Sequence, residues 1–424
     1  MPYLRAALPA PDFSLNGIEA ATATGVEGVV GQFRDLALHS HFQPIVSLAH
    51  RRVVGYEALV RPRDANGGAL SPGVLFDSVV ADDDMVLLDR LARNIHVRNF
   101  VSSGLDQPWL FLNVNARVAV CGKDYGPFFE SMLERHGLAP HRVVIELIEN
   151  EIPDETMLAE AMQYYRDLGC LVAIDDFGAG QSNFERIWRV QPQLVKIDRS
   201  ALIQAREHTR VRRTLPSLVA LLHETGCLTL IEGIENEEEA MIALDTGVDF
   251  VQGFYFGRPA ALSVDGVDCT TVLGGLCDLH AESMRAHTER NRAHLEGYVR
   301  PFRESAGLVA LGVEAAQASQ PLLKLPRVLR CYVLDEHGRQ LGGNLDSSLL
   351  DAHTDHRFQP LMNSDGANWS RRPYFQRAVA KPAEIQISRP YLSITDAKMC
   401  CTMSICVKDA SGALCVFCAD ILDA

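Results

Sequence analysis

Two adjacent carboxylates, Asp175 and Asp176, stand directly after a short apolar run and directly before Phe177-Gly178. An apolar run that ends in acids and glycine predicts a buried strand that opens into a loop. Two unscreened carboxylates at such a point repel each other, so the pair persists only if one is protonated or a cation lies between them. The pair therefore indicates a metal site, although a single Asp-Asp pair, taken alone, more often caps a helix or turns the chain.

Other apolar runs also carry a polar residue toward their C-terminal end, where the Asp pair stands in its own run. An acid or amide buried alone in an apolar strand costs several kcal/mol, so a succession of such strands favours one shared site over separate structural roles. In a closed barrel of parallel strands these ends meet at the C-terminal mouth, where barrel enzymes place their chemistry. The residues are Glu57, Asn113, Glu146, Asp175 with Asp176, Lys196, Glu232 and Gln252.

Carboxylates and an amide oxygen without histidine or cysteine make an all-oxygen site, which suits Mg²⁺ or Mn²⁺ rather than zinc. The two adjacent aspartates could bridge a pair of ions. Two ions about 3.5–4 Å apart clamp the attacking water and the leaving oxygen of an in-line phosphoryl displacement. Lys196, beside such a cluster, could orient the water or offset charge on the phosphate in the transition state. The alternative for Lys196 is a plain salt bridge.

The elements that position these residues alternate along the chain between about residues 30 and 260, with apolar runs separated by amphipathic stretches such as Leu75–Phe100 and Asp154–Leu168. Near-continuous apolar strands alternating with helices predict a parallel sheet covered on both faces. Eight runs in about 230 residues suit a closed (β/α)8 barrel of the TIM type better than an open sheet. The runs are His41–Leu48, Val53–Arg61, Trp109–Asn115, Val143–Glu149, Leu171–Phe177, Leu194–Asp198, Leu228–Glu235 and Phe250–Gly257.

The first two runs depart from the alternation, because only the short segment Ala49 to Arg52 separates them. A parallel crossover needs a dozen or more residues. These two runs must therefore form an antiparallel hairpin inside an otherwise parallel barrel.

The length and net charge of the chain limit the number of domains and the kind of partner that we expect. At 424 residues the chain is too long for one ordinary core, which predicts two domains. The net charge of −14 argues against nucleic acid or an anionic membrane surface as the main partner, because both need clustered Lys and Arg. No apolar run is long enough to span a membrane and the N-terminus lacks the pattern of a signal peptide, so we expect a cytoplasmic protein without membrane insertion.

The motifs in the first part of the chain resemble those of the EAL-domain phosphodiesterases, which hydrolyse the bacterial second messenger cyclic di-GMP. The signature triplet stands as Glu57-Ala58-Leu59, and the resemblance covers about residues 30–260. Its further motifs are Gln43-Pro44-Ile45-Val46, Asn113-Val114-Asn115, Glu146-Leu147-Ile148-Glu149, Asp175-Asp176-Phe177-Gly178, Lys196-Ile197-Asp198, Glu232-Gly233-Ile234-Glu235 and Gln252-Gly253-Phe254-Tyr255-Phe256-Gly257-Arg258-Pro259.

The resemblance implies a barrel with one reversed strand and a two-metal opening of cyclic di-GMP to the linear dinucleotide pGpG, with Mg²⁺ or Mn²⁺ as two ions per site. It implies contacts to the phosphate or guanine from Arg61 and Gln252, a binding groove that includes Gln43 and Leu59, and Glu149 as the anchor of the loop after Asp176. Lys196 would lie near the attacking water. A homodimer is also implied. The metal ligands implied by position are Glu57, Asn113, Glu146, Asp175, Asp176 and Glu232, with Asn113 also beside the substrate.

The chain departs from the family pattern in the loop after Asp176, where Ala179, Gln181 and Asn183 stand in place of the common Thr, Tyr and Ser, and at Pro62, where Trp is common. These changes put rate and regulation in question more than chemistry. Three functions therefore stay open: a cyclic di-GMP phosphodiesterase, a catalytically weak or inactive receptor that signals through a helical linker, and a hydrolase of another phosphodiester.

The last third of the chain changes pattern, with helical periodicity from about Leu276 to Leu323 and strand-like alternation from Arg327 onward. Two strand-Asp-x-x-Gly-strand turns and Arg372-Pro373-Tyr374-Phe375 resemble the PAS and Cache class of α+β sensor domains. An arginine with aromatic walls suits a small carboxylate or similar anion; alternatively the aromatics are core and the arginine forms a surface ion pair. The candidate ligand residues are Trp369, Arg372, Tyr374 and Tyr391.

Cysteines gather in the last two predicted strands, including Cys415 and Cys418. Their spacing is that of metal ligands, but residues three apart on a strand point to opposite faces, which favours core packing. The expected organisation of the whole chain is a loosely ordered leader at 1–28, the barrel at 29–262, a helical linker at 263–325 and the sensor-like domain at 326–424.

Overall fold

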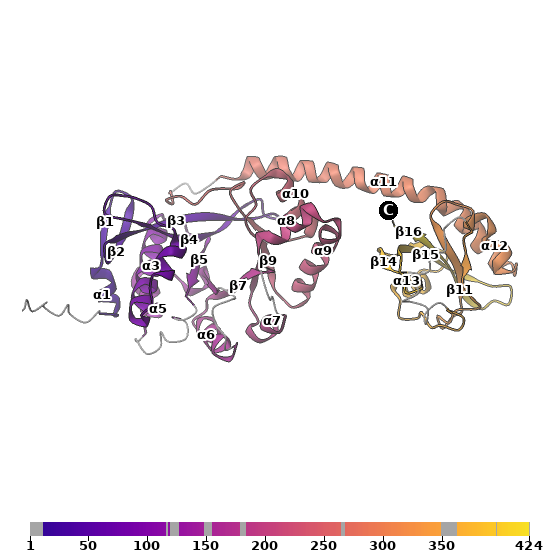
Figure 1. Cartoon of the computed structure of the whole chain (residues 1–424), viewed down its shortest axis with the longest axis horizontal. Coiled ribbons are helices and arrows are strands. Elements are labelled where there is room, and N and C mark those ends of the chain that lie inside the picture. The colour runs from indigo at the N-terminus through magenta and orange to yellow at the C-terminus, as the bar shows by residue number, and fades with distance from the viewer. Residues whose placement is uncertain are drawn as a thin grey trace, which may run out of the picture. The chain divides into compact units, whose positions relative to one another are not determined.

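The computed structural model describes residues 12–115, 118, 127–147, 155–178, 184–263, 268–348, 363–395 and 397–423. Contacts divide the chain into two units, Met1–Ser283 and Met284–Ala424, whose elements are labelled in Figure 1. In the described part of the chain, no helix has both the length and the apolar character needed to cross a membrane.

Eight strands of the first unit close into a barrel, because β3 pairs with β4 on one side and with β10 on the other. Strands β4 to β10 pair in chain order and run parallel, whereas β3 is antiparallel to both of its neighbours. The predicted barrel with one reversed strand, and the predicted hairpin, are confirmed. The strands are β3 (Leu36–Ser47), β4 (Arg52–Arg63), β5 (Trp109–Val114), β6 (Val143–Leu147), β7 (Leu171–Phe177), β8 (Leu194–Ile197), β9 (Leu228–Ile231) and β10 (Phe250–Gln252).

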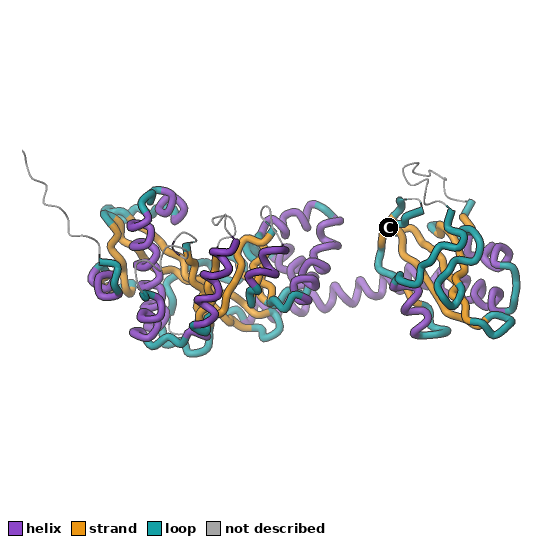
Figure 2. The backbone as a smooth tube through the Cα atoms, turned by 90° about the horizontal axis from the view of Figure 1, so that it is seen from below, coloured by secondary structure: helices purple, strands orange, loops and turns teal. Residues whose placement is uncertain are grey.

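Helices lie around the strands of the barrel (Figure 2). Their apolar residues recur every three or four positions, as Leu88, Leu91 and Ile95 do in α3, and this stripe is fully buried. The amphipathic stretch 75–100 is divided, because α2 ends before Ser78 and α3 begins after Ala81. The helices are α2 (Pro72–Asp77), α3 (Asp82–Ser102), α5 (Phe129–His136), the 3-10 turn η2 (Pro140–Arg142), α6 (Glu155–Asp167), α7 (Phe184–Val190), α8 (Arg199–Glu207), α9 (Thr209–Glu224) and α10 (Glu237–Thr246).

Residues 12–28 differ from the loosely ordered leader expected at 1–28, of which residues 1–11 lie outside the described residues. From residue 15 the chain forms α1 (Leu15–Ala20), β1 (Thr22–Gly25) and β2 (Gly28–Phe33), and β2 pairs with β3 so that the sheet continues beyond the barrel. The Asn99 amide on α3 accepts a hydrogen bond from Val29 N at 2.7 Å and donates to Val29 O at 2.8 Å. These stabilising contacts join residues far apart in the chain, and local periodicity therefore gives no sign of them.

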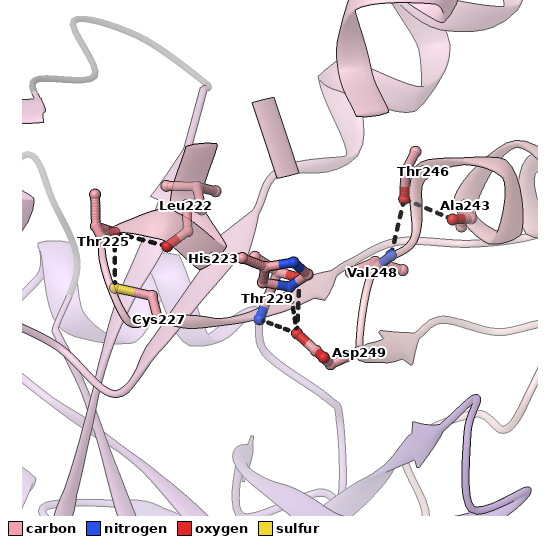
Figure 3. A network of polar contacts seen from close by, with 9 residues as sticks. All are labelled: Leu222, His223, Thr225, Cys227, Thr229, Ala243, Thr246, Val248 and Asp249. Carbon is pink, nitrogen blue, oxygen red and sulfur yellow. Dashed lines mark hydrogen bonds and ion pairs between the residues drawn. The ribbon is translucent and has the colours of Figure 1, made fainter. Parts of the chain in front are cut away.

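The N-terminal end of the barrel is tied by Asp249, which stands just before β10 (Figure 3). Its Oδ2 accepts hydrogen bonds from Thr229 N at 2.8 Å and Thr229 Oγ1 at 3.0 Å, and lies 2.8 Å from His223 Nε2. One carboxylate thus joins the start of β9, the start of β10 and the end of α9, at the opposite end of these strands from the polar residues of the mouth.

The expected helical segment at 263–325 contains α11 (Thr270–Ala310) and α12 (Ala315–Leu323). After them, the second unit forms an all-antiparallel sheet in the order β12-β11-β16-β15-β13, with β14 also on β15. The α+β class expected for this region is confirmed. Its remaining elements are β11 (Val328–Leu334), β12 (Leu345–Asp346), α13 (Pro373–Ala380), β13 (Gln386–Ile387), β14 (Tyr391–Leu392), β15 (Met399–Lys408) and β16 (Leu414–Leu422).

The two faces of this second sheet carry separate cores. Phe417 of β16 packs against Phe302 of α11, with ring centroids 5.2 Å apart, in a cluster that also contains Cys415. Cys418, three residues after Cys415, belongs to the cluster that contains Tyr374 of α13. Both thiols are free and buried. Their position on opposite faces is the packing that the strand period predicts.

Candidate metal centre at the barrel mouth

The register of the strands brings the predicted polar residues to one mouth. Asn113 on β5 pairs with Glu146 on β6, and Gln43 on β3 pairs with Glu57 on β4. Asp175 lies on β7, Lys196 on β8, and Glu232 directly follows β9. Because these strands are neighbours, their side chains at equal heights converge on the axis of the barrel.

Lys196 lies at the centre of this cluster and is 99% buried by side-chain area, with a relative exposure of 1%. Its Nζ is 2.7 Å from Glu146 Oε1 and 2.5 Å from Glu232 Oε1. It is also 3.1 Å from Asp175 Oδ1 and 3.8 Å from Glu57 Oε2. The salt bridge that was the alternative for Lys196 is therefore present, and it reaches four carboxylates that arrive on four different segments.

The two adjacent aspartates reach the same mouth because the backbone of β7 is irregular. Successive side chains of a regular strand point to opposite faces. The pairing of β7 with β8 shifts register between Ile174 and Phe177, and Asp176 has a left-handed φ of 56°. A bulge of this kind re-aims a side chain. As a result, carboxylate oxygens of Asp175, Asp176 and Glu232 lie within 4.8 Å of one another.

The cluster carries an excess of buried negative charge. Burial raises the pKa of Glu146 well above its usual range, which Lys196 opposes and the neighbouring carboxylates reinforce. The pKa of Glu232 is raised well above its usual range by the same causes. Burial disfavours the charged ammonium of Lys196, yet the surrounding carboxylates raise its pKa well above the usual value. The carboxylates therefore need protons or cations beyond the one that Lys196 supplies.

The donor atoms present fit divalent ions that prefer oxygen. Glu146 Oε2 is buried and has no hydrogen-bond partner among the described residues. The carboxylates of Asp175, Asp176 and Glu232 are close enough to share an ion. Carboxylate and amide oxygens without cysteine or histidine suit Mg²⁺, Mn²⁺ or Ca²⁺ and not zinc.

Amide side chains hold Glu57 in place. Asn113 Nδ2 donates to Glu57 Oε1 at 2.9 Å, and Gln252 Nε2 donates to Glu57 Oε2 at 2.6 Å. Gln252 Nε2 also lies 3.3 Å from Gln43 Oε1, and Gln43 Nε2 donates to Gly257 O at 3.2 Å. The four predicted residues therefore form one hydrogen-bonded network beside Lys196.

A pocket of about 330 Å³ lies between β4, β5 and the helices α2 and α3, and of the predicted metal ligands Asn113 lines it. Leu59, Arg61 and Asn113 line it on the barrel side, and α2 and α3 supply its outer wall, which includes Phe76 and His96. The structure thus brings the predicted groove residue Leu59 and the predicted substrate contact Arg61 together with one of the predicted metal ligands. The predicted loop anchor Glu149 and the loop positions 179, 181 and 183 lie outside the described residues.

Glu239 supports the site but is not among the residues predicted from the sequence. Glu239 on α10 is fully buried, and its Oε2 accepts a hydrogen bond from Glu235 N at 2.8 Å. It thereby fixes the loop that carries Glu232. The available signal is the Asn236-x-x-Glu239 pattern of a helix N-terminus, in which Asn236 Oδ1 accepts from Glu239 N at 3.0 Å. That pattern indicates a cap and not a tie to a site.

The predicted sensor residues of the second unit also come together. Trp369, Arg372, Tyr374 and Tyr391 line one pocket with the buried Arg330 and Asp420. Part of the alternative is present, because Tyr374 belongs to a core cluster against which Trp369 and Tyr391 pack. Arg372 lies over the Trp369 and Tyr391 rings and forms no ion pair among the described residues.

Fold and mouth together define a TIM-type barrel with one reversed strand and a cluster of carboxylates around a buried lysine. The sequence profile of the family described as "EAL domain" matches residues 31–259, and the chain therefore belongs to the EAL-domain family.

Some relatives match this chain over little more than half of its length, and one matches it over most of its length. The EAL-domain containing protein YkuI of Bacillus subtilis, itself uncharacterized, is 26% identical over 385 residues, which are 87% of this chain and 91% of YkuI. Cyclic di-GMP phosphodiesterase RocR of Pseudomonas aeruginosa is 26% identical over 248 residues, 57% of this chain and 62% of RocR. An uncharacterized protein of Azorhizobium caulinodans is 32% identical over 248 residues, 55% of this chain but only 33% of its own length.

A solved structure supports the same architecture. The crystal structure of Bacillus subtilis YkuI, in complex with cyclic di-GMP and calcium, has a TM-score of 0.78 and covers 91% of this chain and 96% of its own. At 23% identity this likeness establishes the fold. It extends over both units, so the antiparallel C-terminal sheet is part of the shared architecture.

Proposed function

We propose that the protein is a metal-dependent phosphodiesterase that hydrolyses cyclic di-GMP to linear pGpG. The observation that carries this proposal is the charge of the barrel mouth. Four carboxylates surround Lys196, and Asp176 lies beside two of them, Asp175 and Glu232, so the formal charge of the cluster is −4 when all are ionised. Two divalent cations would neutralise that charge. Membership of the EAL-domain family supports cyclic di-GMP as the substrate.

Glu57, Asn113, Glu146, Asp175, Asp176 and Glu232 would hold two ions, Mg²⁺ or Mn²⁺. When bound, such ions lower the pKa of water and offset the charge of a phosphate in its transition state. Lys196 lies among these ligands, and its ammonium would be the donor that orients the attacking water.

The substrate would lie across the mouth and the adjoining pocket. Arg61 offers a guanidinium to a phosphate, and Gln252 offers an amide to a phosphate or guanine. Leu59 and Gln43 form the floor of the groove. Glu149 is proposed as the anchor of the loop after Asp176.

The proposal extends to the rest of the chain. The C-terminal unit, which we interpret as a PAS/Cache-like sensor, regulates the barrel, and the protein acts as a homodimer. Similarity to YkuI over both units supports a conserved two-part architecture. Light scattering tests the dimer, and a monomer in the presence of substrate and Mg²⁺ would contradict it.

A turnover assay on the full chain with Glu57→Ala tests the central claim. The product is measured by chromatography in the presence of Mg²⁺ or Mn²⁺. We expect the variant to lose more than roughly 100-fold in rate, since changing even the groups that support a metal ligand costs roughly 10- to 100-fold. The matched control is Glu134→Ala, which removes an exposed glutamate of α5 and should leave the rate unchanged.

Two outcomes would redirect the proposal. Equal turnover by wild type and Glu57→Ala would remove the assigned site. Tight binding of cyclic di-GMP by a metal-loaded wild type that never linearises it would replace the enzyme with a receptor that uses the same groove.

A further inference from the structure

The pocket of the second unit contains a cation without a carboxylate partner. Arg372 is half-buried, and its guanidinium carbon lies 6.0 Å from the centroid of the Trp369 ring and 5.6 Å from that of Tyr391. These are cation–π distances. Among the described residues, no carboxylate forms an ion pair with Arg372. The guanidinium is therefore held by aromatic faces, which leave its N–H donors in its own plane for another acceptor.

The carboxylate that lines the same pocket is already committed. Asp420 Oδ2 is 3.6 Å from Arg330 Nε, and both side chains are almost fully buried. Asp420 Oδ1 accepts hydrogen bonds from Thr402 Oγ1 at 2.8 Å and from Tyr332 OH at 3.3 Å. Because the Thr402 proton is used in this way, the Tyr391 hydroxyl 2.7 Å away must donate to Thr402 Oγ1.

The charges of the pocket therefore leave a surplus of one. Arg330 and Arg372 contribute +2 and Asp420 contributes −1, which gives +1 over the charged residues that line it. A partly desolvated cation of this kind is compensated by an anion with a single charge. A ligand ammonium would find no free carboxylate, because Asp420 is occupied.

Neutral groups of the lining add to the same preference. Trp369 Nε1 donates to Gln340 Oε1 at 2.9 Å, which fixes the indole ring beside Arg372. Gln340 Nε2 donates to Asn344 Oδ1 at 3.0 Å. Asn344 thus accepts through its oxygen, and its amide NH₂, which has no partner among the described residues, is a second donor on the pocket wall.

The size of the pocket limits the ligand. The enclosed part of the pocket is only about 20 Å³ and lies within an open hollow of about 310 Å³ that includes solvent. The enclosed part holds a carboxylate group and little more, so the rest of the ligand would lie in the open part. We propose that this pocket binds a short-chain monocarboxylate, with the carboxylate on Arg372 and a tail of a few carbons against the aromatic walls. As a binding site the pocket is independent of the phosphodiesterase; as a regulatory site it rests on the proposed control of the barrel by the C-terminal unit.

Calorimetric titration of the full chain with acetate, propionate, lactate and pyruvate tests the site. We expect saturable binding of at least one of them. Arg372→Lys should weaken it at least about tenfold, because an ammonium cannot offer the planar two-point contact of a guanidinium. Arg372→Gln should abolish it. Arg371→Gln, a change at the exposed neighbouring arginine, is the matched control and should bind as wild type does.

Ligand pairs test the charge argument. Alanine, which adds an ammonium to the propionate skeleton, and acetamide, which removes the charge of acetate, should each bind at least about tenfold more weakly than their partner. No saturable binding up to about 10 mM would overturn the proposal. So would wild-type affinity in Arg372→Gln, or equal affinity for alanine or inorganic phosphate. Should Arg372→Gln fail to fold, Arg372→Lys carries the test.

Turnover of cyclic di-GMP, measured with and without the bound monocarboxylate, separates this inference from the proposed function. Binding is scored without turnover, so an inactive barrel leaves the binding result valid. Binding that leaves turnover unchanged would support the site and contradict the proposed regulation.

Discussion

Lys196 makes the charge of the barrel mouth a property of the whole cluster. Four carboxylates lie between 2.5 and 3.8 Å from its ammonium, so each also lies close to the others. One cation cannot balance them, and burial makes the imbalance more costly than it would be in water. A divalent ion bound there would take the place of protons and reduce the repulsion between the carboxylates. Such an ion should therefore stabilise the folded protein.

The effect of Glu146→Gln on thermal unfolding tests this balance without any measure of activity. In metal-free buffer the variant should unfold at a temperature no lower than that of wild type, because it removes one buried negative charge while Lys196 keeps three carboxylate neighbours. Mn²⁺ or Mg²⁺ should stabilise wild type by about 2.7 kcal/mol at 100 times the dissociation constant. The variant should gain much less. An equal gain in both proteins would show that Glu146 is not a ligand.

For the Asp175-Asp176 pair, the residue types predict the chemistry but not the direction of the two side chains. The acids, their place after an apolar strand and their oxygen-only chemistry could all be predicted from residue types. Their common direction could not, because a regular strand would point them to opposite faces. A register shift in the β7–β8 pairing and the left-handed backbone of Asp176 bring them together, and both depend on how β8 packs beside β7.

At the scale of elements, the loop between β9 and α10 is held from behind. Glu239 accepts the backbone N–H of Glu235 and also lies 3.5 Å from Arg199 Nη2 and 3.6 Å from Arg206 Nη1 of α8. Arg199 in turn donates to Glu235 Oε1 at 2.5 Å. Gly233, in a left-handed conformation with φ 69°, leaves room for the Arg199 side chain, which a Cβ would meet at 2.7 Å. Glu239 is therefore a positioning residue for Glu232.

Glu239→Ala should raise the Mn²⁺ or Mg²⁺ concentration needed for half-maximal turnover by roughly 10- to 100-fold, the usual effect of losing a group that orients a metal ligand. The metal concentration that Glu239→Gln needs should lie between those of Glu239→Ala and wild type, because its amide oxygen can still accept from Glu235 N. Titration of turnover with metal measures both.

Asp249→Ala is the matched control for Glu239→Ala, since Asp249 ties the opposite end of β9 and β10 (Figure 3). It should lower the free energy of unfolding by about 1–3 kcal/mol, the cost of leaving buried donors unpaired. Its metal requirement should match wild type. A metal requirement that shifts equally in both variants would reduce the role of Glu239 to general stability.

The elements themselves divide into those that sequence could predict and those that it could not. The barrel strands follow from alternating runs, and the β3–β4 hairpin follows from a connection too short for a crossover. By contrast, α1, β1 and β2 show no sustained period, and they are stabilised by pairing with β3 and by Asn99 of α3. The tie from Glu239 to Glu235 is invisible for a similar reason: its signal is that of an ordinary helix cap.

At the scale of the whole molecule, one helix belongs to both units. The 41 residues of α11 begin before the boundary at Ser283–Met284 and end beyond it, and Phe302 near its end lies in the core of the second unit. Similarity to YkuI extends over both units. Pro301 removes one bond from the hydrogen-bond ladder of α11, but residues 270–300 contain no proline, and this stretch includes the boundary between the units. If the C-terminal unit regulates the barrel as proposed, this stretch is the part of α11 at which a route through the helix can be tested.

Ala286→Pro tests whether α11 carries the proposed regulation. Ala286 is exposed and lies just after the boundary between the units, so its side chain supports neither core. Proline there removes one backbone hydrogen bond and costs about 3 kcal/mol of helix stability, which kinks or breaks the helix. We expect basal turnover of cyclic di-GMP and affinity for the monocarboxylate to stay within about twofold of wild type. The effect of the monocarboxylate on turnover should be lost. Ala286→Gly, which costs only about 1 kcal/mol and keeps the backbone N–H, should retain most of that effect. If the proline variant responded to the ligand as strongly as wild type, the helix would not be the route of control, because its ladder would be interrupted while the coupling persisted.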